Sequence, residues 1–201
     1  MKTKVGILGG SFNPVHKGHI RIAELVLKHK LVSKVWLLPC FGHYFNKLLT
    51  TPEHRLSMLY KSIKGKKNIE VCAYEIENES DGKMYHTILD LQADYPNIEF
   101  YIIIGMDNAI NIVDWYNYSE LINKVVPFIV IQRVGYYCFE DHYWFNKSPH
   151  ILLKDKMTTE YSSTLAREAI KNKDNNVQEK LMDRSVIDYI KRNGLYNENN
   201  N

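Results

Sequence analysis

The sequence predicts an α/β protein with a Rossmann-like, doubly wound parallel sheet and a small C-terminal helical extension. Short apolar runs recur along the first two thirds of the chain, at residues 5–8, 35–38, 100–104 and 128–131. Segments whose apolar residues follow helical spacing lie between them. Strands that are apolar throughout are buried on both faces, and their alternation with helices indicates parallel pairing.

The expected elements follow one another with clear stop signals. Gly9-Gly10 ends the first strand, and Pro39 ends the second after an intervening helix, which completes a βαβ unit. Pro96 cannot continue the helix before it. In chain order we expect a strand at 5–8, a helix at 18–29, a strand at 35–38, a helix from Pro52, a strand at 69–71, a helix at 85–95 and strands at 100–104 and 128–131.

The last third of the chain is less regular. Residues 136–148 are aromatic and polar without a clear period, which predicts a loop or insertion. A short strand at 151–153 precedes two helices, at 162–171 and 181–191, with the polar stretch 172–176 as their linker. We expect one domain over residues 1–196, with its helical part at about 160–196, and a disordered tail at 197–201.

Composition narrows the class of protein. The chain has 201 residues, with 45% hydrophobic and 24% charged, as in ordinary globular proteins. A net charge of +3 is too small to favour nucleic-acid binding. Three separated cysteines without a CxxC pair suggest neither a zinc site nor a disulfide framework. No apolar run approaches the roughly 20 residues that span a bilayer, and no signal peptide is evident, so we expect a cytoplasmic protein without a membrane partner.

The strongest motif lies between the first strand and the first helix, at residues 9–19, with the sequence GGSFNPVHKGH. Ligands of open parallel sheets bind at the carboxyl ends of strands, and the following helix directs its positive N-terminus there. Gly9 and Gly10 allow a phosphate to approach the backbone. His16 and His19, three residues apart, share one helix face, where both imidazoles can donate to an anion, and Lys17 adds a positive charge.

A second motif, YSSTLAR at residues 161–167, opens a predicted C-terminal helix. Its hydroxyl groups can cap the helix or bind a phosphate at the helix N-terminus. Arg167 lies one turn after Ser163, and its guanidinium can form paired hydrogen bonds to phosphate oxygens.

Together the two motifs resemble the GSFxPxHxGH and SSTxxR signatures of the nucleotidyltransferase superfamily, which includes adenylyltransferases and cytidylyltransferases. The resemblance implies that His16, His19 and Arg167 are catalytic and contact the ATP phosphates, with His19 nearest the α-phosphate. It also implies an ATP site formed by Gly9, Gly10, Ser11, Phe12, Lys17, Gly18, Ser163 and Thr164.

Weaker segments resemble the nicotinate-nucleotide adenylyltransferases within this superfamily. They are Gly105-Met106-Asp107, Trp115-Tyr116, the strand ending at Arg133, and a C-terminal helix that ends in Gly194-Leu195-Tyr196. In that family the tryptophan stacks on the pyridine ring. The resemblance implies that the mononucleotide contacts Lys47, Tyr85, Thr87, Asp107, Trp115, Tyr116 and Arg133.

The sequence departs from this family at several positions. Residues 39–47, PCFGHYFNK, replace the usual Pro-Pro-His-Lys loop, so that Lys47 is the candidate for its lysine. Val134 replaces a proline, and only Tyr85, Thr87 and Leu89 match the Tyr-Thr-x-x-Thr-Leu segment. A different acceptor substrate therefore stays open.

The reaction that the resemblance implies is transfer of AMP from ATP to nicotinate or nicotinamide mononucleotide, with release of pyrophosphate, in NAD biosynthesis. A phosphate monoester, with its second pKa near ~6, is mostly a dianion at neutral pH, so the attack needs no general base. Positioning and charge neutralisation are then the tasks of the protein. We expect Mg²⁺ to be carried by ATP, without a protein ligand cluster.

Three alternatives remain open from the sequence. A pantetheine-phosphate adenylyltransferase fits less well because of the chain length, Trp115-Tyr116 and the C-terminal helix. A cytidylyltransferase is harder to exclude. A non-catalytic nucleotide-binding module would be expected to lose the catalytic histidine, yet His16, His19 and Arg167 are all present. The sequence decides neither between the acid and the amide acceptor nor whether the chain forms a homo-oligomer.

Overall fold

The computed structural model describes residues 2–42, 49–133, 143–157 and 160–197 of the chain. Its centre is a six-stranded sheet in which every pairing is parallel, with the strand order β3-β2-β1-β4-β5-β6. The chain leaves β1 in one direction and returns beside it as β4, so the predicted doubly wound, Rossmann-like fold is confirmed. The strands are β1 (Thr3–Gly10), β2 (Lys34–Pro39), β3 (Ile69–Val71), β4 (Ile98–Gly105), β5 (Phe128–Arg133) and β6 (Ile151–Met157).

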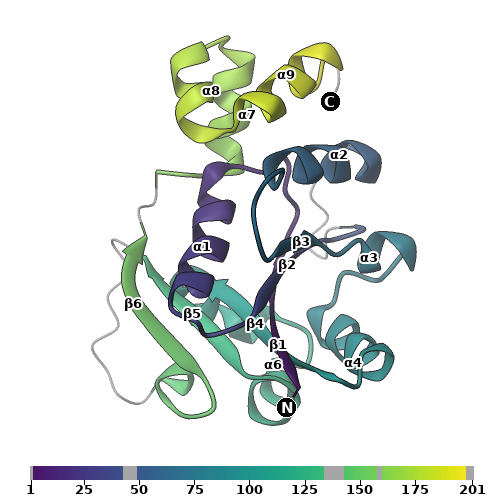
Figure 1. The fold of residues 1–201 in the computed structure, drawn as a ribbon, viewed down its shortest axis with the longest axis vertical. Helices are drawn as coiled ribbons and strands as arrows, with labels where there is room; N and C mark the ends of the chain where they lie inside the picture. The colour runs from purple at the N-terminus through teal and green to yellow at the C-terminus, as the bar shows by residue number, and fades with distance from the viewer. Residues whose placement is uncertain (1, 43–48, 134–142, 158–159, 198–201) are drawn as a thin grey trace.

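Helices cover both faces of this sheet (Figure 1). One face carries α1 (Lys17–Lys28), α2 (Pro52–Ser62) and the C-terminal helices α7 (Ser163–Lys171), α8 (Asn175–Leu181) and α9 (Arg184–Arg192). The other carries α4 (Met84–Asp94), α5 (Met106–Ile110) and the π-helical turn η2 (Leu121–Val125). Short turns complete the set: α3 (Tyr74–Glu77), η1 (Ile112–Asp114), α6 (Tyr118–Glu120) and η3 (Trp144–Asn146).

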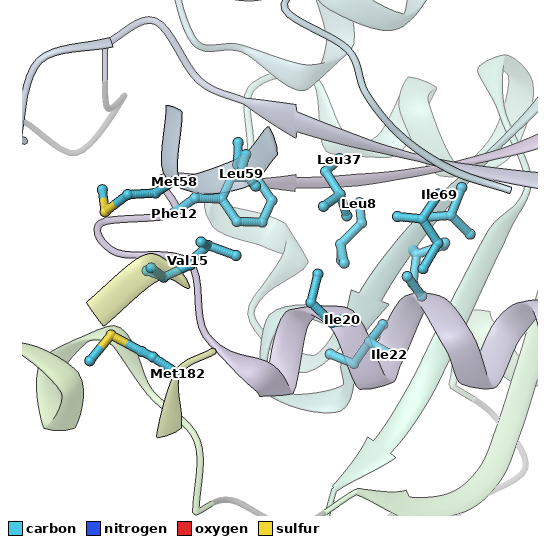
Figure 2. Packing of buried hydrophobic residues seen from close by; sticks show 14 of the residues in the cluster. Leu8, Phe12, Val15, Ile20, Ile22, Leu37, Met58, Leu59, Ile69 and Met182 are labelled. Atoms are coloured by element: carbon cyan, nitrogen blue, oxygen red, sulfur yellow. The ribbon is translucent and has the colours of Figure 1, made fainter. Parts of the chain in front are cut away.

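Two apolar clusters, one on each face of the sheet, form the core. In the first, Ala23 and Val26 of α1 are completely buried together with residues of β2, α2 and the C-terminal helices. Figure 2 shows Phe12, Met58 and Leu59 in this cluster, with Val15 toward Met182. The apolar side chains Phe12 and Val15 therefore anchor the loop after β1 in the core, and the groups of this loop that can contact a ligand are its polar ones.

The three C-terminal helices lie together beyond α1 and α2 (Figure 1). The α2 and α9 helices contact each other, as do α7 and α8, and Met182 and Leu195 belong to the apolar cluster that contains α1. This packing brings the last part of the chain next to the loop that follows β1.

The structure differs from the sequence-based expectation in several places. The polar linker predicted at 172–176 is wrong, because α8 begins at Asn175, where the Asp174 side chain accepts from the Val177 amide. The residues between β4 and β5 contain four short helical elements that had no predicted assignment. Within the predicted loop at 136–148, residues 144–146 form a 3-10 turn and residues up to 142 lie outside the described ranges. Most of the predicted tail, 198–201, also lies outside them.

Among the described helices, none combines the length and the apolar composition that crossing a bilayer requires.

Candidate active site

A cavity of about 380 Å³ opens at the carboxyl ends of β1 and β4, where the connections leave toward opposite faces of the sheet. This is the switch point at which doubly wound sheets bind ligands, and the volume is that of a small-molecule site. Its lining residues come from four regions of the chain. They include Gly9, Gly10, Ser11 and His19 near the first helix, Cys40 and Glu75 at the side, Lys83 and Tyr85 near α4, and Gly105, Asn108, Trp115 and Tyr116 after β4.

The end of β1 lies close to the start of α4. A Cβ atom on Gly9 would lie 2.7 Å from the methyl group of Met84, a flexible side-chain end that would have to shift. Phe12 takes a left-handed backbone conformation, with φ of 47°, and its ring is 1% exposed. The loop therefore turns sharply while Phe12 is held in the core, and Gly10 and Ser11 line the cavity.

The two histidines lie against each other at the N-terminus of α1. His16 is the N-cap residue, and its ring stacks on that of His19 with 3.7 Å between ring centroids. The His16 backbone amide donates to Nδ1 of His19 at 3.2 Å. Because Nδ1 is then an acceptor, a neutral His19 ring carries its proton on Nε2 and offers it as a donor. His19 lines the cavity. His16 is 8% exposed and packs against the His19 ring without lining the cavity itself.

The second motif meets the first across almost the whole sequence. Ser163 Oγ donates to the Pro14 carbonyl oxygen at 2.8 Å, and Arg167 Nη1 donates to the Asn13 carbonyl oxygen at 2.7 Å. Arg167 Nη2 also contacts Thr164 Oγ1 at 3.2 Å. Arg167 thus reaches the loop that carries the histidines, although of the predicted catalytic residues only His19 lines the cavity itself.

Lys17 and Gly18, both predicted at the ATP site, have different surroundings. The Lys17 ammonium donates to the main-chain oxygen of Glu179 in α8, so the structure directs it toward the C-terminal helices. A Cβ atom on Gly18 would lie 2.6 Å from Cβ of Tyr161 and 2.9 Å from Nδ1 of His16. Gly18 is therefore required for the close contact between the two motifs.

Aromatic residues form the end of the cavity that was predicted to bind the acceptor. Tyr85 and Tyr116 meet edge to face with ring centroids 6.0 Å apart, and Trp115 lies beside them in the lining. The Tyr85 hydroxyl donates to Glu120, which raises the pKa of Tyr85. The Lys83 ammonium is 4.8 Å from the centroid of the Tyr116 ring. A flat ring can stack in such surroundings.

Two of the predicted acceptor contacts, Thr87 and Asp107, do not line the cavity, and two more, Lys47 and Arg133, have side chains that the structure does not describe. Thr87 is 1% exposed, and its hydroxyl donates to Glu75 Oε1 at 2.8 Å, so it supports the wall from behind. Asp107 lies in the first turn of α5, but Gly105 and Asn108 line the cavity there. Lys47 lies outside the described residues. Arg133 ends β5, and the structure does not describe its side chain.

Several residues at the site were not among the predicted site residues, although Asn13 lies inside the first motif and Tyr196 inside the C-terminal segment that resembles the family. The Asn13 side-chain oxygen accepts from the Thr50 amide at 3.2 Å and from the Tyr196 hydroxyl at 2.8 Å. Burial raises the pKa of Tyr196 to about 12, so this hydroxyl stays a donor at neutral pH. Arg55 in α2 is 0% exposed and bonds to main-chain oxygens of the site loops. Single polar residues of this kind are indistinguishable from surface residues in a sequence.

Two further polar side chains line the cavity wall. Burial raises the pKa of the Glu75 carboxyl, and the hydrogen bond from Thr87 opposes that effect. Burial also raises the pKa of the Cys40 thiol, which favours its neutral form. Within the described ranges, His, Cys, Asp and Glu side chains nowhere gather in threes as a metal site requires.

Comparisons with known proteins agree with this geometry. Residues 7–169 match the model of the cytidylyltransferase-like family. The chain is 35% identical over 196 residues to a probable nicotinate-nucleotide adenylyltransferase of Bacillus cytotoxicus, with 96% of this chain and 98% of the relative covered. It is 33% identical to a protein of the same name from Methylacidiphilum infernorum, with 96% and 92% covered.

The structural comparison supports the same fold. The Plasmodium falciparum nicotinic acid mononucleotide adenylyltransferase complexed with NaAD superposes with a TM-score of 0.82 at 23% identity, with 96% of this chain and 97% of that chain covered. The two sequence signatures contact each other, the cavity lies at the switch point of the sheet, and the relatives match over almost their full length. The chain therefore belongs to the nicotinate-nucleotide adenylyltransferase family of the cytidylyltransferase-like proteins.

Proposed function

We propose that this enzyme transfers AMP from ATP to nicotinate or nicotinamide mononucleotide, forming the dinucleotide and pyrophosphate in NAD biosynthesis. The observation that carries the proposal is the position of His19. Its Nδ1 accepts the His16 amide, and its ring lines the same cavity as the aromatic group Tyr85, Trp115 and Tyr116. A hydrogen-bond donor for a phosphate and an aromatic stacking surface in one cavity suit an acceptor that carries both a phosphate and a flat ring.

His19 is the residue we assign to the α-phosphate. With Nδ1 already bonded, its Nε2–H is a donor that needs no reorientation when the reaction occurs. Donors fixed in advance stabilise the charge that develops on the phosphate oxygens in the transition state. His16 keeps the ring in place by stacking, and the N-terminus of α1 adds a positive potential.

Arg167, Ser163 and Thr164 are assigned to the rest of the triphosphate. Their support is the pair of short hydrogen bonds that fix α7 to Asn13 and Pro14, directly before the histidines. Arg167 is half-buried and retains N–H groups beyond those bonded to Asn13 and Thr164. A guanidinium so placed neutralises negative charge as pyrophosphate leaves.

The 5′-phosphate of the acceptor attacks the α-phosphorus of ATP in line. At neutral pH this phosphate is mostly a dianion, because its second pKa is near ~6, and the step needs no protein base. The enzyme contributes by holding the two nucleotides in one cavity. Trp115 and its aromatic neighbours hold the pyridine ring, and we assign Lys47 and Arg133 to the same substrate.

The donor set of the cavity suits Mg²⁺ that arrives on ATP. The side chains that we assign to the triphosphate are imidazoles, a guanidinium and hydroxyl groups, which donate hydrogen bonds to phosphate oxygens rather than bind a hard cation. When bound, the ion neutralises charge on the phosphate oxygens.

The test is release of pyrophosphate by the purified chain. ATP is paired in turn with nicotinate mononucleotide, nicotinamide mononucleotide and 4′-phosphopantetheine, and the series is repeated with CTP. We expect pyrophosphate release and dinucleotide formation with ATP and a pyridine mononucleotide. Faster reaction with CTP would identify a cytidylyltransferase, faster reaction with 4′-phosphopantetheine would identify the sister adenylyltransferase, and binding without turnover would identify a nucleotide-binding module.

A further inference from the structure

We propose that Arg55, which lies outside both nucleotidyltransferase motifs, is a positioning residue for ATP: its buried guanidinium holds the loop after β1 against the loop after β2. The inference rests on the proposed assignment of residues 9–19 to ATP.

The guanidinium is bonded on several sides to main-chain oxygens. Nη1 donates to the Cys40 oxygen at 2.7 Å and to the Ser11 oxygen at 3.2 Å. Nη2 donates to the Phe41 oxygen at 3.0 Å, and Nε donates to the Thr50 oxygen at 2.9 Å. One side chain of α2 thus joins three segments: Ser11 in the loop after β1, residues 40–41 after β2, and Thr50 just before α2.

Two of these segments form the cavity. Ser11 and Cys40 both belong to its lining, and Arg55 bonds to both through the same nitrogen atom. The Cys40 amide donates to the Gly10 oxygen at 3.1 Å, and the Arg55 guanidinium adds a planar side-chain bridge between the two loops just beyond this main-chain contact. Such a group fixes direction as well as distance, because its N–H bonds are rigid with respect to one another.

The third segment continues the connection to the other motif. Arg55 bonds to the oxygen of Thr50, and the amide of Thr50 donates to the side chain of Asn13. The main-chain oxygen of Asn13 accepts from Arg167. A continuous series of hydrogen bonds therefore runs from Arg55 to the arginine assigned to the triphosphate.

The charge of Arg55 also acts on a residue of the cavity wall. The side chain is 0% exposed, burial lowers its pKa, and no carboxylate forms an ion pair with it in the described parts of the chain. Burying a charge in this way is unfavourable unless other groups compensate. Four carbonyl oxygens accept from its N–H groups. Burial raises the pKa of the Glu75 carboxyl, which lines the same cavity, and the positive charge of Arg55 opposes that rise.

The competing explanation is that Arg55 only stabilises the fold. A matched pair of variants separates that role from positioning of ATP. Arg55→Lys keeps the charge but replaces the planar fork with donors from one atom, so it cannot span the same oxygens. Leu59→Ala changes a residue one turn later on α2 that is also 0% exposed; it shortens a side chain of the apolar cluster but removes no hydrogen bond to the site loops. Both variants should lower the melting temperature.

The measurement is calorimetric binding of α,β-methylene ATP, together with the KM for ATP and kcat, at a temperature where each variant is folded. We expect Arg55→Lys to weaken binding by about tenfold or more, because misplacement on the order of 1 Å can cost about 100-fold. Leu59→Ala should bind within about twofold of wild type, since it leaves the loops joined. Arg55→Gln, which keeps two donors, gives the same comparison if Arg55→Lys does not fold.

Wild-type affinity in a folded Arg55 variant would overturn the inference, as would equal weakening in Arg55→Lys and Leu59→Ala. Failure of the proposed function gives a different result, because the wild-type chain itself would then neither bind the analogue nor release pyrophosphate.

Discussion

Replacing His19 with alanine tests the proposed chemistry most directly. The substitution removes the Nε2–H donor from the cavity while the rest of the lining keeps its side chains. Loss of one preorganised donor to a developing oxyanion lowers kcat by about 10²–10³-fold, equivalent to about 2.7–4 kcal/mol. We expect His19→Ala to lower kcat by on the order of 10²-fold or more.

The same substitution has a separate effect on stability that must be measured with it. His19 Nδ1 accepts the amide of the N-cap residue, and loss of a cap costs about 1 kcal/mol. For a chain of this size such a loss lowers the melting temperature by about 2–4 °C. Kinetics recorded well below the transition therefore report catalysis and not unfolding.

The assay is pyrophosphate release at saturating ATP and mononucleotide, with circular dichroism to record the melting temperature. His29→Ala is the matched control, because His29 lies at the other end of α1 and contacts Asp155 at 2.9 Å on the surface. The control should keep wild-type turnover. If folded His19→Ala turned over at the wild-type rate, His19 would have no part in the reaction.

Three further predictions follow from the same geometry. Trp115→Ala should weaken binding of the mononucleotide more than that of ATP in titration calorimetry, and equal losses would remove the stacking role. Gly18→Ala should destabilise the fold by about 1–3 kcal/mol and lower activity, because its Cβ would meet Tyr161 at 2.6 Å. Gly42→Ala, whose Cβ has no atom of the described residues within 4 Å, should have the wild-type melting temperature. Because the pKa of Tyr196 is raised from 10.0 to about 12, its contribution to stability is complete below pH 10 and is lost as the pH rises toward 12. Alkaline denaturation of Tyr196→Phe should therefore be less steep over this range, and an unchanged profile would show that Tyr196 is not the titrating group.

Most of the fold could be predicted because strands buried on both faces leave a plain pattern. The run at 100–104 lies inside β4, and the run at 69–71 coincides with β3. α8 was missed because its sequence, NNVQEKL, is largely polar, and only Val177 and Leu181 mark an apolar side. Its stability comes from the Asp174 cap and from packing against α7, which depend on tertiary context.

The site was predictable where a motif keeps its residues adjacent and unpredictable where the contact spans the chain. The histidine pair lies within one turn, so its spacing alone places both rings together. Arg55 looks like an exposed helical residue, and the partners of Asn13 lie 37 and 183 residues away. Main-chain oxygens accept most of these hydrogen bonds. Every residue has such an oxygen, so the sequence does not show which of them will be an acceptor.

The bonds at Asn13 also constrain how the enzyme is made. Asn13 is among the first residues to be synthesised. Its side-chain oxygen accepts from Tyr196 and its main-chain oxygen accepts from Arg167, both of which are synthesised near the end. During synthesis the loop after β1 therefore does not have both of these hydrogen-bond partners until residue 196 has been added. Nucleotide affinity should consequently arise only after residue 196 has left the exit tunnel, so that an unfinished chain does not sequester ATP.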